Sequence, residues 1–540
     1  MRRRPLMFTL AFALVAVLGY WLVGKTRPRE VSRGGQPVEG FRGPANGADD
    51  PMPKFRHGGR DSVKKGDTDA ENAGALEGQR IVVFKDRAAL EDFLKQSGPG
   101  IRLLGRLDSL NALRIGFSDY DELLAMMDGS EEESFVFPVY TPTPKDGSVQ
   151  DGAVAMGNNL LNWLGVSGDN SPWGKGVRIA ILDTGVTANS TFNTGINMIN
   201  LVGLPSDPSA QNGHGTAVAS MIIGNDSLAP GVAPSTDILS VRIADDNGLS
   251  DSFLLAKGIV AAVDAGVSLI NISMGGFGDS RIVRNAIEYA NERGVLIFAA
   301  AGNNGTQELT YPASNAGVIA VGAVDAMGNH LDFSNSGTSV AISAPGYGVN
   351  AAWSGNEFAS VTGTSFSTPI VAGSVAAIMS QSGKVDLTAA QAWQLLTTYL
   401  NDGGAAGADA QLGAGMPDIG RVQTGNTPGV YDAAVASTRI LPPDAGNPYG
   451  QVEILVQNRG TETLINAGVR VSTGAGMVSS NINSLAANAV TTVRVPITRP
   501  PTAGVSTMKV DAQVVLSGGV QDAKPSNDRR VETYAAPSGR

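Results

Sequence analysis

The chain has 540 residues, no cysteine, three histidines and a net charge of −10 at neutral pH. At about 100–200 residues per domain, this length predicts several folded units. The absence of cysteine excludes disulfides, a thiol nucleophile and thiolate-bound metal centres, so covalent catalysis would need a hydroxyl, amine or carboxylate side chain. The acidic balance argues against general nucleic-acid binding, because phosphates select basic surfaces.

The first 78 residues are predicted to form an anchor and a spacer. Arginines at 2–4 precede an uncharged stretch of nineteen residues at 6–24. A bilayer needs roughly 20 such residues, and the arginines favour a cytoplasmic N-terminus. We expect residues 1–24 to be a single membrane anchor, with a cleaved signal peptide as the alternative; both place the rest outside the cytoplasm. Residues 25–78, rich in Gly, Pro and charged residues, are predicted to be a disordered spacer.

Residues 79–146 are predicted to form a small α+β domain. The order is strand, helix, strand, strand, helix, strand, at 81–84, 88–95, twice within 101–117, at 120–127 and at 135–140. This order fits a ferredoxin-like sandwich whose last strand is Phe135–Tyr140. Element order by itself predicts no function for the domain.

Residues 149–425 are predicted to form a doubly wound, mostly parallel α/β sheet. Short apolar runs suit buried parallel strands at 177–182, 238–242, 268–272, 295–300 and 318–324. Helical stretches lie at 253–264, 281–292, 365–380 and 388–400. Sites in such sheets form at the carboxyl ends of the strands.

Residues 430–535 change to short alternating strands separated by Gly, Asn and Pro turns. The predicted strands lie at 452–456, 467–471, 490–497 and 508–516. This texture, over about 110 residues, is typical of a β-sandwich.

Three polar residues stand at the ends of predicted elements in the α/β domain. Asp183 follows strand 177–182, His214 opens an apolar helical run, and Ser365 begins helix 365–380. Each taken alone is better explained as a cap or turn residue. Together they supply a nucleophile, an imidazole to take its proton and a carboxylate to orient the imidazole. A helix N-terminus at the serine would also favour a developing oxyanion.

The segments around these residues resemble the subtilisin-like serine proteases, the subtilases. The matching strings, in the family's order of Asp, His and Ser, are DTG at 183–185, NGHGTAVAS at 212–220 and GTSFSTPIVAG at 363–373. The resemblance runs through the α/β domain. It implies a subtilisin-like fold and peptide-bond hydrolysis by a triad of Asp183, His214 and Ser365.

The resemblance extends to residues that would hold the substrate. Asn303, in the string AAAGN at 299–303, stands at the family's position for a side-chain donor to the oxyanion, beside the Ser365 N–H. Loss of this donor in subtilisin itself costs about 10²–10³ in rate. Substrate contacts are further implied for Ser273, Met274, Gly275, Gly302 and Tyr311. Their neutral surroundings favour an apolar or medium-sized polar residue before the cut.

The resemblance also implies a role for residues 79–146. Many subtilases carry an α+β propeptide of this size, which lays its last strand in the active-site cleft as an inhibitor. Phe135–Tyr140 would be that strand, and self-cleavage is expected between Tyr140 and Ala153. The alternative is an ordinary accessory domain.

The departures from the family concern calcium and the C-terminal strands. No cofactor is needed for the chemistry. The chain lacks the His-Pro and the Asp that follow the catalytic Asp in many secreted relatives, so a structural calcium site has no complete motif despite Asn225 and Asp226.

Residues 430–535 resemble the Ig-like, CARDB-like modules of exported bacterial proteins. Such a module could bind a substrate or a cell surface, or it could only stabilise the protein; the sequence leaves both roles open.

The sequence therefore predicts an exported serine endopeptidase, made as a zymogen, acting on proteins or peptides. Its activity is expected to fall below about pH 6–7, where an imidazole base is protonated. One alternative is a catalytically inactive scaffold that binds proteins through the C-terminal module. Others are an acid-active Ser/Glu/Asp peptidase, which would lack His214 and Asn303, and a maturation protease with a single partner.

Overall fold

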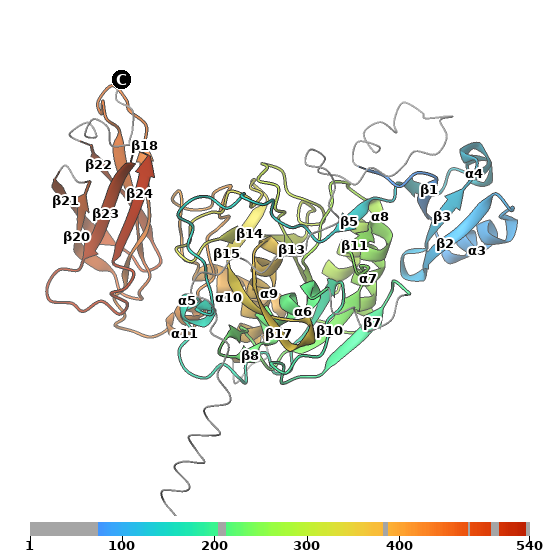
Figure 1. The fold of residues 1–540 in the computed structure, drawn as a ribbon, viewed down its shortest axis with the longest axis horizontal. Helices are drawn as coiled ribbons and strands as arrows, with labels where there is room; N and C mark the ends of the chain where they lie inside the picture. Colours follow the sequence, from blue (N-terminus) through green and yellow to red (C-terminus); the bar gives the residue numbers. More distant parts are fainter. Residues whose placement is uncertain (1–73, 204–211, 382–386, 474–475, 498–506, 536–540) are drawn as a thin grey trace, which may run out of the picture. The chain divides into compact units, whose positions relative to one another are not determined.

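The computed structural model describes residues 74–203, 212–381, 387–473, 476–497 and 507–535. The predicted anchor and nearly all of the predicted spacer lie outside these residues. Within the described ranges, no helix is both long and apolar enough to span a bilayer. The described chain contains an α+β part, an α/β part and a β part, in that order (Figure 1).

The α+β part is built on one antiparallel sheet with the strand order β2-β3-β1-β4. Its elements are β1 (Gln79–Val83), α3 (Arg87–Gln96), β2 (Ile101–Leu107), η1 (Asp108–Leu110), β3 (Ala112–Phe117), α4 (Tyr120–Met126) and β4 (Glu132–Ser134). Asp86 and Asp119 cap the two α-helices by accepting backbone N–H groups. Leu90, Leu113 and Leu123 are fully buried in a separate small core between helices and sheet.

The last strand of this sheet lies earlier in the chain than predicted. The sheet closes with the short polar strand β4, whereas β5 (Pro138–Tyr140) leaves it and pairs antiparallel with β11 (Leu249–Asp251) of the α/β part (Figure 1). Val136 and Val139 are buried in the core of the α/β part. The apolar pattern at 135–140 therefore indicates a buried extended segment. The alternation of apolar and polar residues does not, however, specify which strand this segment pairs with.

The α/β part contains a sheet of seven parallel strands in the order β15-β14-β13-β12-β6-β10-β7, which confirms the predicted class. The strands are β6 (Arg178–Asp183), β7 (Ile196–Asn200), β10 (Asp237–Arg242), β12 (Leu269–Ile272), β13 (Leu296–Ala300), β14 (Val318–Val324) and β15 (Val340–Pro345). The sequence analysis missed β7 and β15, the two edge strands. Asparagines interrupt β7, and β15 ends in Ser-Ala-Pro, so neither reads as a continuous apolar run.

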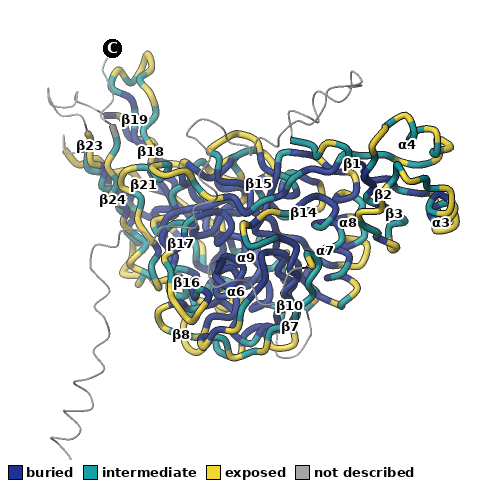
Figure 2. Tube along the Cα trace, turned by 45° about the vertical axis from the view of Figure 1, so that its right-hand side comes forward, coloured by how far each residue is buried: buried dark blue, intermediate teal, exposed yellow. Residues whose placement is uncertain are grey.

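Two separate apolar cores cover the two faces of this sheet. Ile179 and Ile181 of β6 belong to the core shared with α6 and α9, while Ala180 and Leu182 face the core shared with α7 and α8. Figure 2 shows α6 and α9 buried along most of their length. The helices are α5 (Leu160–Trp163), α6 (His214–Ile223), α7 (Ser252–Asp264), α8 (Arg281–Asn291), α9 (Thr364–Gln381), α10 (Ala389–Thr398) and α11 (Ile419–Thr424).

Short elements complete the α/β part. They are the two-stranded ladder β8 (Asn225–Asp226) with β9 (Ala229–Pro230), and the ladder β16 (Val349–Trp353) with β17 (Glu357–Val361), joined by η2 (Ser354–Asn356). The β16–β17 ladder leads directly into α9. It therefore fixes the entry of the chain into the helix that begins at Thr364.

The β part consists of two antiparallel sheets around one apolar core, as the sequence predicts. The sheets have the orders β18-β19-β22 and β21-β20-β23-β24. The strands are β18 (Ala433–Leu441), β19 (Gln451–Asn458), β20 (Leu464–Ser472), β21 (Met477–Leu485), β22 (Val490–Pro496), β23 (Thr507–Val515) and β24 (Arg529–Ala535). The sequence analysis missed β18, β21 and β24.

Three carboxylates gather near the start of β24. Asp432 accepts a hydrogen bond from Asn527 Nδ2 at 2.9 Å, and Asp522 accepts one from the Ala433 N–H at 2.8 Å. Among the described residues, Oδ1 of Asp528 is buried without a hydrogen-bond partner. Burial, followed by the negative charges of Asp522 and Asp432, raises the pKa of Asp528 to about 7.

A raised carboxyl pKa makes this part of the protein less stable as pH rises. An unfolded Asp ionises near pH 4, so stability is lost between about pH 4 and pH 7. In a Ser365→Ala background, Asp528→Asn should therefore raise the Tm of the β part at pH 8 and have little effect at pH 4, as measured by scanning calorimetry. Asp511→Asn is the control, because Arg529 lowers the pKa of Asp511; a similar gain from both variants would contradict the assignment.

Candidate active site

The site is built around Asp183, the last residue of the central strand β6. Its side chain is fully buried. Oδ1 accepts hydrogen bonds from the Thr184 N–H at 2.7 Å and from Thr184 Oγ1 at 3.1 Å. A carboxylate removed from water requires such donors, so the Thr184 hydrogen bonds hold the Asp183 carboxylate in one orientation in place of water.

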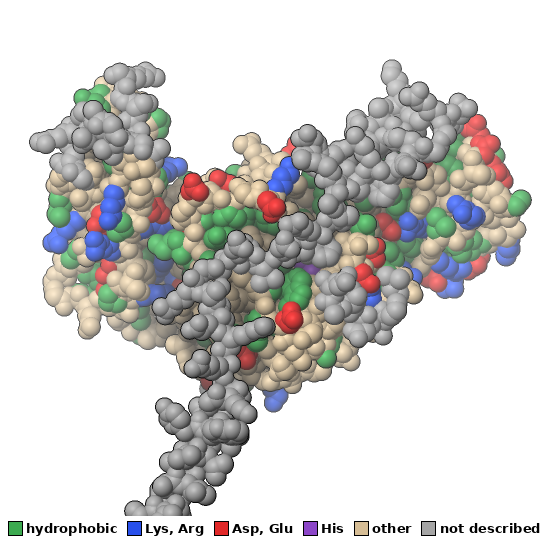
Figure 3. Space-filling view, in the orientation of Figure 1, with side chains coloured by type: hydrophobic (Ala, Val, Ile, Leu, Met, Phe, Trp, Pro, Cys, Tyr) green, Lys and Arg blue, Asp and Glu red, His purple; other side chains and the backbone are tan. Residues whose placement is uncertain are grey.

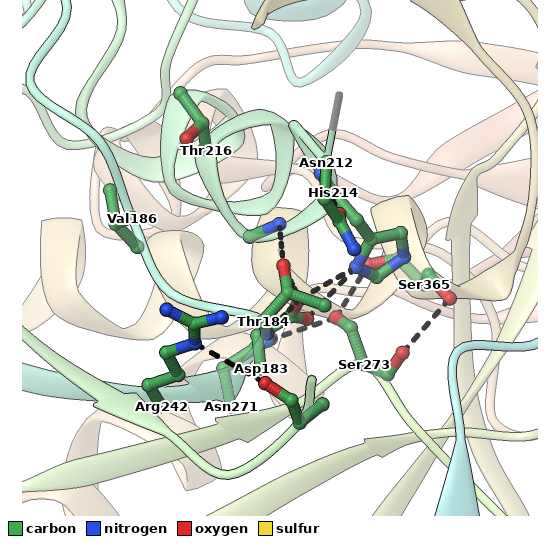
Figure 4. Close-up of polar contacts among 12 residues, drawn as sticks. Asp183, Thr184, Val186, Asn212, His214, Thr216, Arg242, Asn271, Ser273 and Ser365 are labelled. Atoms are coloured by element: carbon green, nitrogen blue, oxygen red, sulfur yellow. Dashed lines mark hydrogen bonds and ion pairs between the residues drawn. The ribbon is translucent and has the colours of Figure 1, made fainter. Parts of the chain in front are cut away.

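His214 reaches the carboxylate from the first turn of α6. Its Nδ1 lies 2.8 Å from Oδ1 and 3.0 Å from Oδ2 of Asp183 (Figure 4). A carboxylate only accepts hydrogen bonds, so Nδ1 holds the proton and Nε2 of the neutral ring is left as an acceptor. The Asn212 side chain accepts the His214 N–H at 3.2 Å and holds the start of the helix.

Ser365 lies beside this pair, at the start of α9 (Figure 4). Its hydroxyl donates to the carbonyl oxygen of Ser273 at 3.1 Å, and the Ser273 hydroxyl donates to the Ser365 carbonyl at 2.6 Å. Within the described part of the chain, the buried Nε2 of His214 has no hydrogen-bond partner. The structure thus brings Asp183, His214 and Ser365 together, with the serine hydroxyl turned to Ser273 rather than to the imidazole.

Asn303 follows β13 and contacts Thr364, the residue before Ser365. Its Oδ1 accepts the Thr364 N–H at 2.9 Å and the Thr364 hydroxyl at 2.8 Å. Two donors on one end fix the amide orientation, so Nδ2 is the end that points away from Thr364. Nδ2 donates to the carbonyl oxygen of Pro142 at 2.8 Å. The candidate oxyanion donor therefore holds a peptide carbonyl of the same chain.

The segment after β12 presents backbone to an extended chain. Gly275 and Tyr140 exchange two backbone hydrogen bonds of 3.0 Å each, and Gly276 pairs in the same way with Tyr311. A Cβ at Gly275 would lie only 2.5 Å from Thr310 Oγ1, so this position needs glycine. Met274 is fully buried in the apolar core, so its side chain supports the segment from behind.

Gly302 is the other glycine of the predicted substrate set. Its φ is +112°, and its N–H donates to Thr364 Oγ1 at 3.3 Å. A Cβ there would lie 3.0 Å from the Asn335 side-chain carbon. The Gly302 backbone is therefore fixed between Thr364 and Asn335, directly before Asn303.

The extended segment at 137–142 lies between two edges of the α/β part. On one side β5 pairs with β11, and the Thr141 N–H donates to the Gly248 carbonyl at 3.1 Å; on the other side Tyr140 pairs with Gly275. Gly276 allows this approach, because a Cβ there would overlap the Pro138 carbonyl oxygen. The sequence analysis missed Gly248 as a contact residue, although the 68 glycines of the chain were a signal for close backbone approach.

Ion pairs also join the α+β part to the α/β part. Arg114 of β3 donates to Asp251 at 2.7 Å, and Arg281 of α8 donates to Glu132 at 2.6 Å. The other Asp251 oxygen caps α7 through two backbone N–H groups. One carboxylate thus both begins a helix of the α/β part and binds the α+β part.

The described residues offer no group of three or more His, Asp or Glu side chains in reach of a common metal ion. Figure 3 shows one face, where Lys and Arg side chains stand among Asp and Glu side chains rather than in one broad area.

Comparisons with known proteins agree on one family. The subtilase family model matches residues 174–415. A thermostable alkaline protease of Halalkalibacterium halodurans is 40% identical over 215 residues. These residues are 39% of this chain and 58% of that relative, so the chain spans little more than half of the relative's length. A thermophilic serine proteinase of a Bacillus species, strain AK1, is 32% identical over 336 residues, covering 60% of this chain and 82% of that relative.

A solved structure shows the same fold. The epidermin leader peptide processing serine protease of Staphylococcus aureus matches with a TM-score of 0.53 at 20% identity, over 65% of this chain and 98% of that one. The named relatives are an alkaline protease and a serine proteinase. The chain belongs to the subtilase family.

The contact between α6 and the end of β6 can be tested at Gly215. A Cβ there would lie 3.2 Å from Asp183 Oδ1 and 3.0 Å from the Gly185 carbonyl carbon, and closer still to its oxygen. Gly215→Ala must therefore shift His214 away from Asp183, and we expect kcat/KM to fall about 10²-fold. Peptide hydrolysis is the measurement, with circular dichroism to verify folding. Gly195→Ala, which meets no atom within 4 Å, is the control; equal activities of the two variants would contradict this account.

Proposed function

We propose that this chain is an exported serine endopeptidase in which Ser365 is the nucleophile, His214 the general base and acid, and Asp183 the group that orients the imidazole. The observation that supports this most directly is the peptide carbonyl of Pro142, hydrogen-bonded to Asn303 next to the Asp183–His214 pair and Ser365. A peptide carbonyl, a hydroxyl, an imidazole and a polarising donor are the groups that acyl transfer needs.

The proposed reaction has two halves. His214 Nε2 takes the Ser365 hydroxyl proton as Oγ attacks the carbonyl carbon, and Asn303 Nδ2 with the Ser365 N–H stabilises the oxyanion. The imidazolium then gives its proton to the leaving amine, which releases one peptide and leaves an acyl-enzyme. Water attacks the acyl-enzyme in the same way and releases the acid. Asp183 holds the ring throughout and supports its positive charge.

We further propose that the α+β part is a ferredoxin-like propeptide and that the full chain is a zymogen. The strand order β2-β3-β1-β4 supports the first assignment. The second is supported by the position of segment 137–142, which pairs with both Gly248–Asp251 and Gly275 as an extended substrate would. Residues 79–146 would then inhibit the enzyme until the chain is cut between Tyr140 and Ala153.

The remaining proposals concern localisation and partners. The uncharged stretch at 6–24 would either anchor the enzyme in the membrane or be removed as a signal peptide; both lead outside the cytoplasm. Protein or peptide substrates would enter by the path of segment 137–142. The two-sheet C-terminal part is proposed to be an Ig-like module that binds a substrate or a cell surface.

The nucleophile can be tested by active-site labelling. Fluorophosphonates phosphonylate a serine only where a neighbouring base activates it. The chain that has been cut between Tyr140 and Ala153 and freed of its N-terminal part should therefore be labelled at Ser365, as located by mass spectrometry. Ser365→Ala should abolish the label, whereas Ser367→Ala, two residues along the same helix, should keep it. A folded, released protein that hydrolyses no casein and takes no label would contradict the proposal and favour an inactive scaffold.

The oxyanion donor can be tested at Asn303. Asn303→Ala should lower kcat by about 10²–10³ with little change in KM, because the donor acts on charge that develops in the transition state. Asn303→Asp retains an acceptor for both Thr364 donors but has no N–H to offer, so its kcat should fall as well. If Asn303→Asp kept wild-type kcat, the role of Asn303 would be limited to holding Thr364.

A further inference from the structure

The register of the chain's own strand places Pro142 opposite Ser273. Tyr140 and Gly275 exchange both backbone hydrogen bonds at 3.0 Å. In an antiparallel ladder the next such pair lies two residues further on one strand and two residues back on the other, which gives residues 142 and 273. Residue 142 should therefore donate its N–H to the Ser273 carbonyl. Proline has no N–H, so this bond of the ladder is missing.

The Ser273 carbonyl accepts the nucleophile's hydroxyl at this point. Ser365 Oγ donates to it at 3.1 Å, and in the described structure the buried Nε2 of His214 is left without a partner. A buried carbonyl that loses its ladder donor gains by taking another one, and the Ser365 hydroxyl is within reach. The hydroxyl proton is thereby directed to a carbonyl that cannot remove it.

The carbonyl group of Pro142 is nevertheless held as a scissile carbonyl would be. Asn303 Nδ2 donates to its oxygen at 2.8 Å, and the other end of that amide is fixed by two donors of Thr364. Thr141, one residue earlier, donates its N–H to Gly248 at 3.1 Å. The segment is therefore bound on both edges up to Pro142, and the peptide bond to Thr143 follows.

We propose that Pro142–Thr143 is the bond that the protein cuts in its own chain, and that Pro142 delays this cut because its missing N–H leaves the Ser273 carbonyl to hold the Ser365 hydroxyl away from His214. The proposal rests on the proposed function, with Ser365 as nucleophile. Proline at this position makes the segment a slow substrate, which prolongs inhibition by the α+β part.

The covalent step balances within the chain and one water molecule. Ser365 Oγ forms a bond to the Pro142 carbonyl carbon and its proton passes to His214. The bond from that carbon to the Thr143 nitrogen breaks, and the His214 proton goes to this nitrogen. Water then displaces Ser365 Oγ, which recovers its proton through His214. The products are a carboxylate at Pro142 and an amine at Thr143.

The test compares self-cleavage of the full chain with and without Pro142. Pro142→Ala supplies the missing N–H to Ser273 and releases the Ser365 hydroxyl to His214. Because one hydrogen bond is worth about a factor of ten in rate, the variant should be cut about tenfold faster. The chain is made by cell-free translation, its cleavage is followed on gels over time, and the released enzyme is sequenced from its N-terminus, which should be Thr143.

Pro99→Ala is the matched control. It replaces an exposed proline that the cut also removes, but this proline lies in the turn between α3 and β2 of the α+β part, outside segment 137–142. Its cleavage rate should remain that of the wild type. Both variants release an enzyme of identical sequence, so the activity per labelled active site must not differ. A purely structural effect on the enzyme itself is thereby excluded.

The outcomes separate this inference from the proposed function. An active enzyme whose N-terminus is not Thr143, or equal cleavage rates for Pro142→Ala and the wild type, would overturn the inference and leave the proposed function intact. No cleavage together with no fluorophosphonate label would overturn both. Should Pro142→Ala not fold, synthetic peptides of residues 135–147 with Pro or Ala at 142 are given to the released enzyme. The Ala peptide should be cut faster after 142, and equal rates would overturn the inference.

Discussion

The buried Asp183 carboxylate determines how the elements around the site are arranged. A carboxylate without contact to water must be surrounded by donors, and here these are the two donors of Thr184 and the imidazole of His214. The start of α6 must therefore lie against the end of β6. That contact is possible only because Gly215 has no side chain to strike the Gly185 carbonyl. The orientation of the imidazole, and with it the position of Nε2, follows from this one packing constraint.

The sheet brings the other groups to the same edge. β12 is the neighbour of β6 and β13 is the neighbour of β12, so the segments after these strands bring Ser273 and Asn303 to the same edge of the sheet as Asp183, although the three residues are far apart in the sequence. α9 packs on the same strands and against α6, and it delivers Ser365 from its first turn. All of these residues lie at element ends, where backbone N–H and C=O groups are not fully used within helix or sheet. The site thus combines rigid positions with unused hydrogen-bonding groups.

The same edge also binds the chain's own extended segment. Glycines at 248, 275 and 276 leave the backbone open on both sides, and segment 137–142 fills that space with paired hydrogen bonds. Binding by backbone pairing is insensitive to side chains, so a substrate and an inhibitory segment can use the same edges. The difference between them must then lie in single positions. Pro142 is such a position, because it presents a carbonyl to Asn303 but no N–H to Ser273.

The sequence by itself determined the α/β class, most buried strands and helices, and the candidate site residues, because apolar periodicity and short motifs are local properties of the chain. It missed the edge strands β7 and β15 and the polar strand β4, whose residues lack a continuous apolar run. Only the tertiary structure decided which edges Pro138–Tyr140 pairs with, that Pro142 faces Ser273 and that the Ser365 hydroxyl turns from His214. These features depend on strand register, and an alternating pattern pairs equally well with many edges until the packed core selects one.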